Sequence, residues 1–328
     1  MHRTALNFRL TRRINFPTYW PELGVDPKTP SKRLFPTPYT YENLLDSSCF
    51  TATESLYTGP NKWSQVYRGS LTSPSLGSFN DVVLKVFSST HFPHAHSDLG
   101  CLSISPPDTI SPNSYRYTDE LMAWAEVYAY RKLYPLQGAT IPRFFDALMV
   151  QSPESGEESI GIIISHIKGI SIVARCLELG GEIDGDTRWY PLARELYRNI
   201  YRINQLGICG LDIRDANVRV VEPGGCCECG PPSVVLFDFA FSRPNFFFDD
   251  SDRKRHRVEA VMIQDLFDLK GLTANMCGGG IGSACSAQGV RARRWAFLEW
   301  VRQEHPDDQW IAAWAPHFVA LKPGNPRN

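Results

Sequence analysis

The stretch Gly207-Ile208-Cys209-Gly210-Leu211-Asp212-Ile213-Arg214-Asp215-Ala216-Asn217-Val218 is the most informative part of this sequence. An Asp and an Asn stand five positions apart in it, and a second Asp follows the apolar run Ser233 to Phe237, in Asp238-Phe239-Ala240. An apolar run of this length predicts a short strand. Two carboxylates and an amide oxygen in this order are the groups that ATP-dependent phosphoryl transfer uses.

Each residue of this pattern has a predicted role. Asp212 accepts the proton of an attacking hydroxyl or orients it, and Arg214 offsets charge on the transferring phosphoryl group. Asn217 and Asp238 hold magnesium through hard oxygen ligands. The alternative, a turn carboxylate at position 212 and an Asp that merely ends a strand at position 238, requires two separate coincidences of spacing.

Lys85 is a lone charge in the apolar strand Val82-Val83-Leu84-Lys85-Val86-Phe87. Burial of an unpaired ammonium is costly, so this residue predicts a carboxylate partner or a ligand phosphate. The segment Thr118 to Tyr134 predicts a helix that ends at Pro135, and its periodicity turns Glu126 toward the core while Glu120 lies on another face. We therefore expect an ion pair between Lys85 and Glu126. A solvent-facing Lys on an edge strand is the alternative.

The segment Thr58-Gly59-Pro60-Asn61-Lys62-Trp63-Ser64-Gln65-Val66-Tyr67-Arg68-Gly69 is the candidate for a loop over the phosphates. Such loops are rich in glycine because backbone amides approach phosphate closely. Here a single glycine precedes the strand, with Ser64 at a position for a small residue. A nucleotide clamp and an ordinary hairpin turn both remain open.

Composition limits the classes of partner. The chain has 328 residues, 43% apolar and 21% charged, with a formal net charge of -1, which is ordinary for a globular protein and gives no electrostatic footprint for nucleic acid. No apolar run reaches the roughly 18 residues of a membrane span. We expect no nucleic-acid and no membrane partner, and a solvated arm rather than a transit peptide for the Arg-containing N-terminus.

The nine cysteines are expected to be reduced thiols in a cytoplasmic or nuclear location. Cys226, Cys227 and Cys229 lack the paired spacing of zinc sites, so they predict a solvent-facing turn rather than a metal centre.

Several motifs together resemble the protein-kinase-like superfamily, and in particular its fungal protein-kinase-like group. They are Leu84-Lys85, Glu126, Leu136-Gln137-Gly138-Ala139-Thr140-Ile141-Pro142, Ser165-His166-Ile167-Lys168-Gly169, Asp212 to Asn217, and Asp238-Phe239-Ala240. The resemblance covers about residues 55 to 270. It implies ATP and Mg²⁺ as cofactors, Lys85 at the α and β phosphates, and the main chain of Ser165 and Ile167 as the hinge that meets adenine.

The sequence also departs from the family pattern. Gly210 stands where the family has a His, Leu211 where it has an Arg, and Ala240 where it has a Gly. No Ala-Pro-Glu segment or long activation loop is recognisable. The resemblance therefore implies no specificity for a peptide substrate.

The resemblance implies an α+β, two-lobed fold with a small antiparallel-sheet N-lobe and a mainly helical, abbreviated C-lobe. Along the chain we expect an irregular arm, an N-lobe with an insertion, a C-lobe, and a flexible linker with a Trp-rich helical tail. Their bounds are 1–50, 51–168 with the insertion 88–114, 169–270, and 271–328.

The leading interpretation is an ATP- and magnesium-dependent phosphotransferase with an unknown hydroxyl acceptor, on a protein or a small molecule. The alternative is a pseudokinase that binds nucleotide or a partner without turnover. A third hypothesis, a small-molecule kinase similar to aminoglycoside or choline kinases, differs in substrate rather than in chemistry.

Overall fold

The computed structural model of the chain describes residues 6–13, 48–74, 77–93, 118–179, 190–222, 233–244, 296 and 299–304. The chain divides into two compact units, one formed by Met1–Arg131 with Arg143–His166 and the other by Lys132–Pro142 with Ile167–Asn328. Some predictions lie outside the described residues. These are the Cys226–Cys229 turn, the insertion beyond residue 93, the segment 245–295 and most of the Trp-rich tail.

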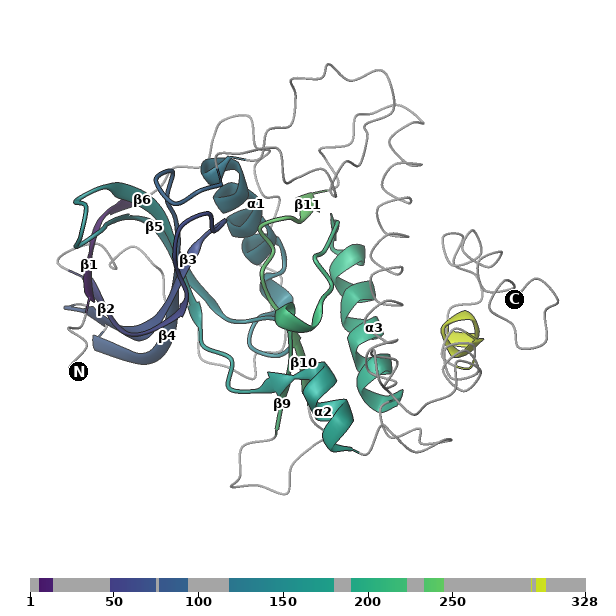
Figure 1. Cartoon of the computed structure of the whole chain (residues 1–328). Coiled ribbons are helices and arrows are strands. Elements are labelled where there is room, and N and C mark those ends of the chain that lie inside the picture. The colour runs from purple at the N-terminus through teal and green to yellow at the C-terminus, as the bar shows by residue number, and fades with distance from the viewer. Residues whose placement is uncertain are drawn as a thin grey trace, which may run out of the picture. The chain divides into compact units, whose positions relative to one another are not determined.

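The first unit is built on six strands that close into an antiparallel barrel in the order β1-β2-β3-β4-β6-β5 (Figure 1). Their bounds are β1 Leu6–Arg13, β2 Cys49–Tyr57, β3 Gln65–Ser73, β4 Gly77–Phe87, β5 Phe144–Gln151 and β6 Glu158–Ser165. The predicted antiparallel sheet is therefore present, but it is closed rather than open. Closure leaves no edge strand, so a Lys on any of these strands is not an edge residue.

Alternation along β1 explains why the expectation of an irregular arm fails for residues 6–13. Phe8 and Leu10 point into the barrel and are buried, whereas Asn7 and Arg9 are exposed. This period of two is the signature of a half-buried strand. The barrel interior is apolar and is filled by Phe8, Leu10, Phe50, Ala52, Leu71, Val82, Leu84, Val86, Leu148, Val150 and Ile163.

A bulge in β4 interrupts the pairing of β3 with β4. Gly69 pairs with Val82 and Ser70 with Asn80, so Asp81 is the extra residue, and its φ is 64°. Asp is one of the few residues besides glycine that tolerates this left-handed conformation. Gly69 is required for another reason, since a Cβ there would lie 2.0 Å from the carbonyl oxygen of Thr51.

Helix α1, Asp119–Lys132, lies beside the barrel in Figure 1 and matches the helix predicted from the sequence. Thr118 caps it, because its hydroxyl accepts a hydrogen bond from the amide of Leu121 at 3.1 Å. The residues from Met122 to Tyr130 are all buried. Glu126 is thus an acid within an otherwise mostly apolar face.

The second unit contains short strands and helices. Their bounds are η3 Tyr134–Leu136, β7 Ile170–Ser171, α2 Ile172–Glu178, α3 Tyr190–Gln205, β8 Ile208–Cys209, η4 Asp215–Asn217, β9 Val218–Val221, β10 Ser233–Leu236 and β11 Arg243–Pro244. The strands form one sheet of order β10-β9-β7 and a β11-β8 pair. Over the residues that the structure describes, no helix has the length and apolar character needed to cross a membrane.

Helix α3 has an apolar face, on which Leu192, Leu196, Ile200 and Ile203 are all buried. Gly207 follows the helix with a φ of 84°, the left-handed conformation of a helix C-terminus. Asn199 on α3 donates a hydrogen bond to the carbonyl of Val234 on β10 at 2.8 Å. This hydrogen bond joins helix α3 to strand β10.

Candidate functional site

Lys85 and Glu126 form a buried ion pair within the first unit. The Nζ of Lys85, on β4, lies 2.6 Å from the Oε2 of Glu126, on α1. Lys85 faces outward from the barrel because its neighbours Leu84 and Val86 occupy the interior. The pairing that the sequence suggested is present, and Glu120 instead accepts a hydrogen bond from the indole of Trp124 at 3.4 Å.

The Asp212 loop holds three predicted residues together within the second unit. The Nδ2 of Asn217 donates to both the carboxylate Oδ2 and the backbone oxygen of Asp212, each at 3.0 Å. The Nε of Arg214 lies 2.8 Å from the same Oδ2. The 3₁₀ turn η4 creates this arrangement by bringing Asn217 back over the loop. Both contacts fix the direction of the Asp212 carboxylate.

Asp238 lies in the turn that follows β10 and has a φ of 66°. The amide of its neighbour Phe237 donates to the carbonyl of Asn217 at 3.2 Å, which fixes this turn beside the Asp212 loop. Phe239 is 2% exposed and anchors the other side of the turn. The backbone of Asp238 is thus held from both sides in a conformation that few side chains tolerate.

The donor chemistry of Asn217 and Asp238 fits a hard cation. Because the Nδ2 of Asn217 donates to Asp212, the atom of its side-chain amide that can bind a metal ion is the oxygen. Asp238 adds a carboxylate. Mg²⁺ is bound in proteins through one or two carboxylates together with substrate phosphates and waters, so this pair is chemically suited to it. Among the described residues there is no group of three or more His, Cys, Asp and Glu side chains that could hold a metal ion alone.

The hinge candidates flank the boundary between the two units, which falls after His166. Ser165 is bound twice to Arg143, since its amide donates to the Arg143 carbonyl at 2.8 Å and its hydroxyl accepts from the Arg143 amide at 2.9 Å. Ser165 can therefore offer a ligand its carbonyl oxygen and its hydroxyl hydrogen, but not its amide. His166 is held by its amide, which donates to the carbonyl of Asp81 at 3.1 Å. Ile167 is half-buried and belongs to the second unit.

The loop between β2 and β3 is closed by a side chain that the sequence analysis did not single out. Gln65 is 4% exposed, and its side chain donates to the Gly59 carbonyl and accepts from the Gly59 amide, both at 2.8 Å. The amide of the one glycine in this loop is consequently occupied. A Gln at the start of a strand is an ordinary residue, so the sequence held no signal for this contact.

Six of the eight predicted site residues form two local groups, and Ser165 and Ile167 belong to neither. Lys85 and Glu126 meet in the first unit. Asp212, Arg214, Asn217 and the turn of Asp238 meet in the second.

Comparisons with known proteins give little beyond this geometry. No protein-family model matches the chain, and no curated protein matches it. Among solved structures, the BubR1 kinase domain matches with a TM-score of 0.43 and 13% sequence identity, covering 85% of this chain and 87% of that chain. A likeness at this level assigns neither an activity nor a ligand.

Proposed function

We propose that the chain is an ATP- and Mg²⁺-dependent phosphotransferase of protein-kinase-like fold that acts on an acceptor hydroxyl. The single observation that supports this most strongly is the Asp212 loop. One carboxylate there is held by an amide and a guanidinium at 3.0 and 2.8 Å, beside a turn that presents a second carboxylate. This is the set of groups that phosphoryl transfer needs.

The roles of the residues follow from their contacts. Asp212 orients the acceptor hydroxyl and receives its proton, and Asn217 fixes the direction of its carboxylate. Arg214 has its Nε on Asp212 and so keeps its terminal nitrogens for phosphate oxygens. Asn217 and Asp238 would hold Mg²⁺, which neutralises phosphate charge when bound.

Lys85 would contact the α and β phosphates, with Glu126 holding its ammonium in place. The carbonyl of Ser165 and the main chain of Ile167 would meet adenine. The proposed location of the protein is cytoplasmic or nuclear.

A second candidate, a nucleotide-binding pseudokinase, is favoured by the Gln65 contact. A loop that covers phosphates does so with free backbone amides, and the Gly59 amide donates to Gln65 instead. The departures at Gly210 and Ala240 point the same way. In this case the chain binds nucleotide or a partner and transfers no phosphoryl group.

Thermal unfolding with nucleotide tests the proposal. ATP with Mg²⁺ should raise the midpoint, because a ligand at 100 times its Kd stabilises by about 2.7 kcal/mol. Chelation of Mg²⁺ should remove most of the shift, and Asp238→Asn should remove it while Glu178→Gln, an exposed acid on α2, leaves it unchanged. If no nucleotide shifts the midpoint of the wild type, the phosphotransferase and the nucleotide-binding form of the pseudokinase are both wrong.

A further inference from the structure

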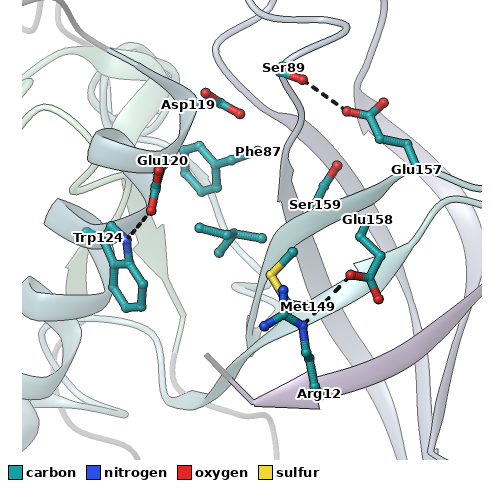
Figure 2. A pocket seen from close by; sticks show the side chains of 11 residues that line it. Arg12, Phe87, Ser89, Asp119, Glu120, Trp124, Met149, Glu157, Glu158 and Ser159 are labelled. Carbon is teal, nitrogen blue, oxygen red and sulfur yellow. Dashed lines mark hydrogen bonds and ion pairs between the residues drawn. The ribbon is translucent and has the colours of Figure 1, made fainter. Parts of the chain in front are cut away.

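The first unit contains a pocket that the proposed function does not use. It has a volume of about 390 Å³ and lies between the first turns of α1 and the strands β4, β5 and β6 (Figure 2). A pocket of this size suits a small ligand or one extended side chain. Its lining residues are Arg12, Phe87, Ser89, Asp119, Glu120, Trp124, Met149, Glu157, Glu158, Ser159 and Ile160.

The floor and one wall of the pocket are apolar. Phe87 is 1% exposed and Trp124 is 4% exposed, and Met149 and Ile160 complete this surface. Figure 2 shows Trp124 and Glu120 on the α1 side, Ser159, Glu157 and Glu158 on the opposite side, and Phe87 and Met149 between them. Both aromatic side chains are almost fully buried, so they form a packed base beneath the pocket and expose little of their rings to a ligand.

The rim of the pocket is strongly acidic. Four carboxylates line it, from Asp119, Glu120, Glu157 and Glu158, against one guanidinium, from Arg12. Arg12 neutralises little of this charge, because its Nε is 3.8 Å from Glu158 and both side chains are largely exposed. Burial raises the pKa of Asp119, and the charges of Glu120 and Glu157 contribute to the rise. Phosphate and other anions are disfavoured here.

Two carboxylates are held in position by neighbouring side chains. The indole of Trp124 donates to Glu120 at 3.4 Å, and the hydroxyls of Ser89 and Thr90 donate to Glu157 at 3.1 and 2.6 Å. These contacts fix acceptors on opposite walls of the pocket. A ligand that carries several N–H donors can meet both.

Ser159 adds a further polar group on the β6 wall. It is 7% exposed and lines the pocket, and within the described part of the chain nothing hydrogen-bonds to its hydroxyl. The hydroxyl is not among the described side-chain atoms that are buried without a partner, so it is accessible from the pocket. A donor brought by a ligand can bond to it.

We propose that this pocket binds the guanidinium side chain of an arginine presented by a polypeptide partner. A guanidinium carries five N–H donors in a planar fork, which can reach carboxylates on both walls and the Ser159 hydroxyl. Its charge matches the excess of carboxylates. The site lies wholly in the first unit and is independent of the proposed phosphotransferase activity.

Titration with short peptides tests this assignment. The probe is acetyl-Gly-Arg-Gly-amide, with the citrulline peptide as an uncharged isostere and the Lys peptide as a non-planar cation. Calorimetry gives the affinity, and the NMR signal of the Trp124 indole N–H reports binding in the pocket. We expect the arginine peptide to shift this signal and to bind at least about tenfold more tightly than the citrulline peptide, with an affinity that falls as salt rises.

Matched variants separate the pocket from general surface charge. Glu120→Gln removes an exposed rim charge and should weaken the arginine peptide at least about fivefold. Glu154→Gln removes an exposed acid outside the pocket in the same unit and should leave the affinity unchanged. Equal binding of the arginine and citrulline peptides, no binding to the wild type, or equal weakening by the two variants would each overturn the proposal.

Discussion

The ammonium of Lys85 lies 2.6 Å from the carboxylate of Glu126, and the two side chains are only 7% and 1% exposed. Neither charge is shielded by solvent, so each depends on the other. Removal of one partner from such a pair leaves a buried, uncompensated charge, whereas removal of both is often close to neutral. The pair holds Lys85 on the outer face of β4. The alternative interpretation, a solvated Lys on an edge strand, is excluded because the barrel is closed.

A double-mutant cycle tests this dependence. Lys85→Met should lower the free energy of unfolding by about 3–5 kcal/mol, because it leaves Glu126 buried without its cation. Lys85→Met combined with Glu126→Gln should recover most of that loss. Chemical denaturation measures both.

The matched control is Glu54→Gln, which removes an exposed acid paired with Arg68 in the same unit. It should leave the unfolding midpoint close to that of the wild type. If Lys85→Met proves as mild as this control, the pair is not the buried contact described above.

The metal role of Asp238 and Asn217 predicts a specific pattern for nucleotide binding. Asp238→Asn keeps a residue that tolerates the φ of 66° and removes the charge, so it should lower the affinity for Mg²⁺–ATP at least about tenfold with little loss of stability. Calorimetric titration with ATP at several Mg²⁺ concentrations measures this. An unchanged Mg²⁺ dependence in the variant would exclude Asp238 as a ligand.

The Gln65 contact predicts that the loop between β2 and β3 is held by its own strand. Gln65→Ala should cost about 1 kcal/mol or more, because it leaves the polar backbone groups of Gly59 without their partner. Hydrogen exchange at Gly59 should accelerate in the variant. If the pseudokinase hypothesis holds, the Gly59 amide that Gln65→Ala frees should also make the variant bind ATP more tightly than the wild type. Weaker ATP binding by the variant would indicate instead that the loop binds ATP in its closed form.

The environment of His166 predicts a pH effect on stability. Burial lowers the pKa of His166 below its usual 6.5, and the charge of Arg68 lowers it further, while Asp81 and Glu54 act in the opposite direction. The folded state disfavours the protonated imidazole of His166. The neutral His166 therefore contributes stability above its unfolded pKa of about 6.5, and this contribution is lost as the pH falls through its lower pKa in the folded state.

The unfolding midpoint of the wild type should therefore fall more between pH 7.5 and 5.5 than that of His166→Gln. Thermal unfolding at the two pH values measures the difference. The same fall in both proteins would show that His166 is not the titrating group.

The sequence predicted the elements with strong local patterns. The helix of Glu126 has a helical period and the strand of Lys85 is a short apolar run, and the structure has both elements. Strand β1 was missed although Phe8 and Leu10 alternate with polar residues, because the surrounding Pro-rich and Tyr-rich sequence hid so short a pattern. Strand β5 and helix α2 were also missed.

Contacts that depend on folding in three dimensions could not be predicted. Barrel closure requires β1 to pair with β5, more than a hundred residues away, and no local signal specifies that. The Gln65 contact, the Asp81 bulge and the acidic pocket likewise arise from residues that are unremarkable in the sequence. The spacing of Asp212 and Asn217 was informative because their contact is formed within one turn.

The most direct test of the central claim is transfer of the γ-phosphoryl group from labelled ATP, with wild type and Asp212→Asn compared in the presence of Mg²⁺ and a panel of peptide and small-alcohol acceptors. Asp212→Asn can still accept the hydrogen bond from Asn217 but cannot take a proton. We predict turnover by the wild type and a loss of about 10²–10⁴-fold in the variant. Equal turnover by the two proteins, or binding of ATP by both with no transfer by either, would contradict the phosphotransferase proposal.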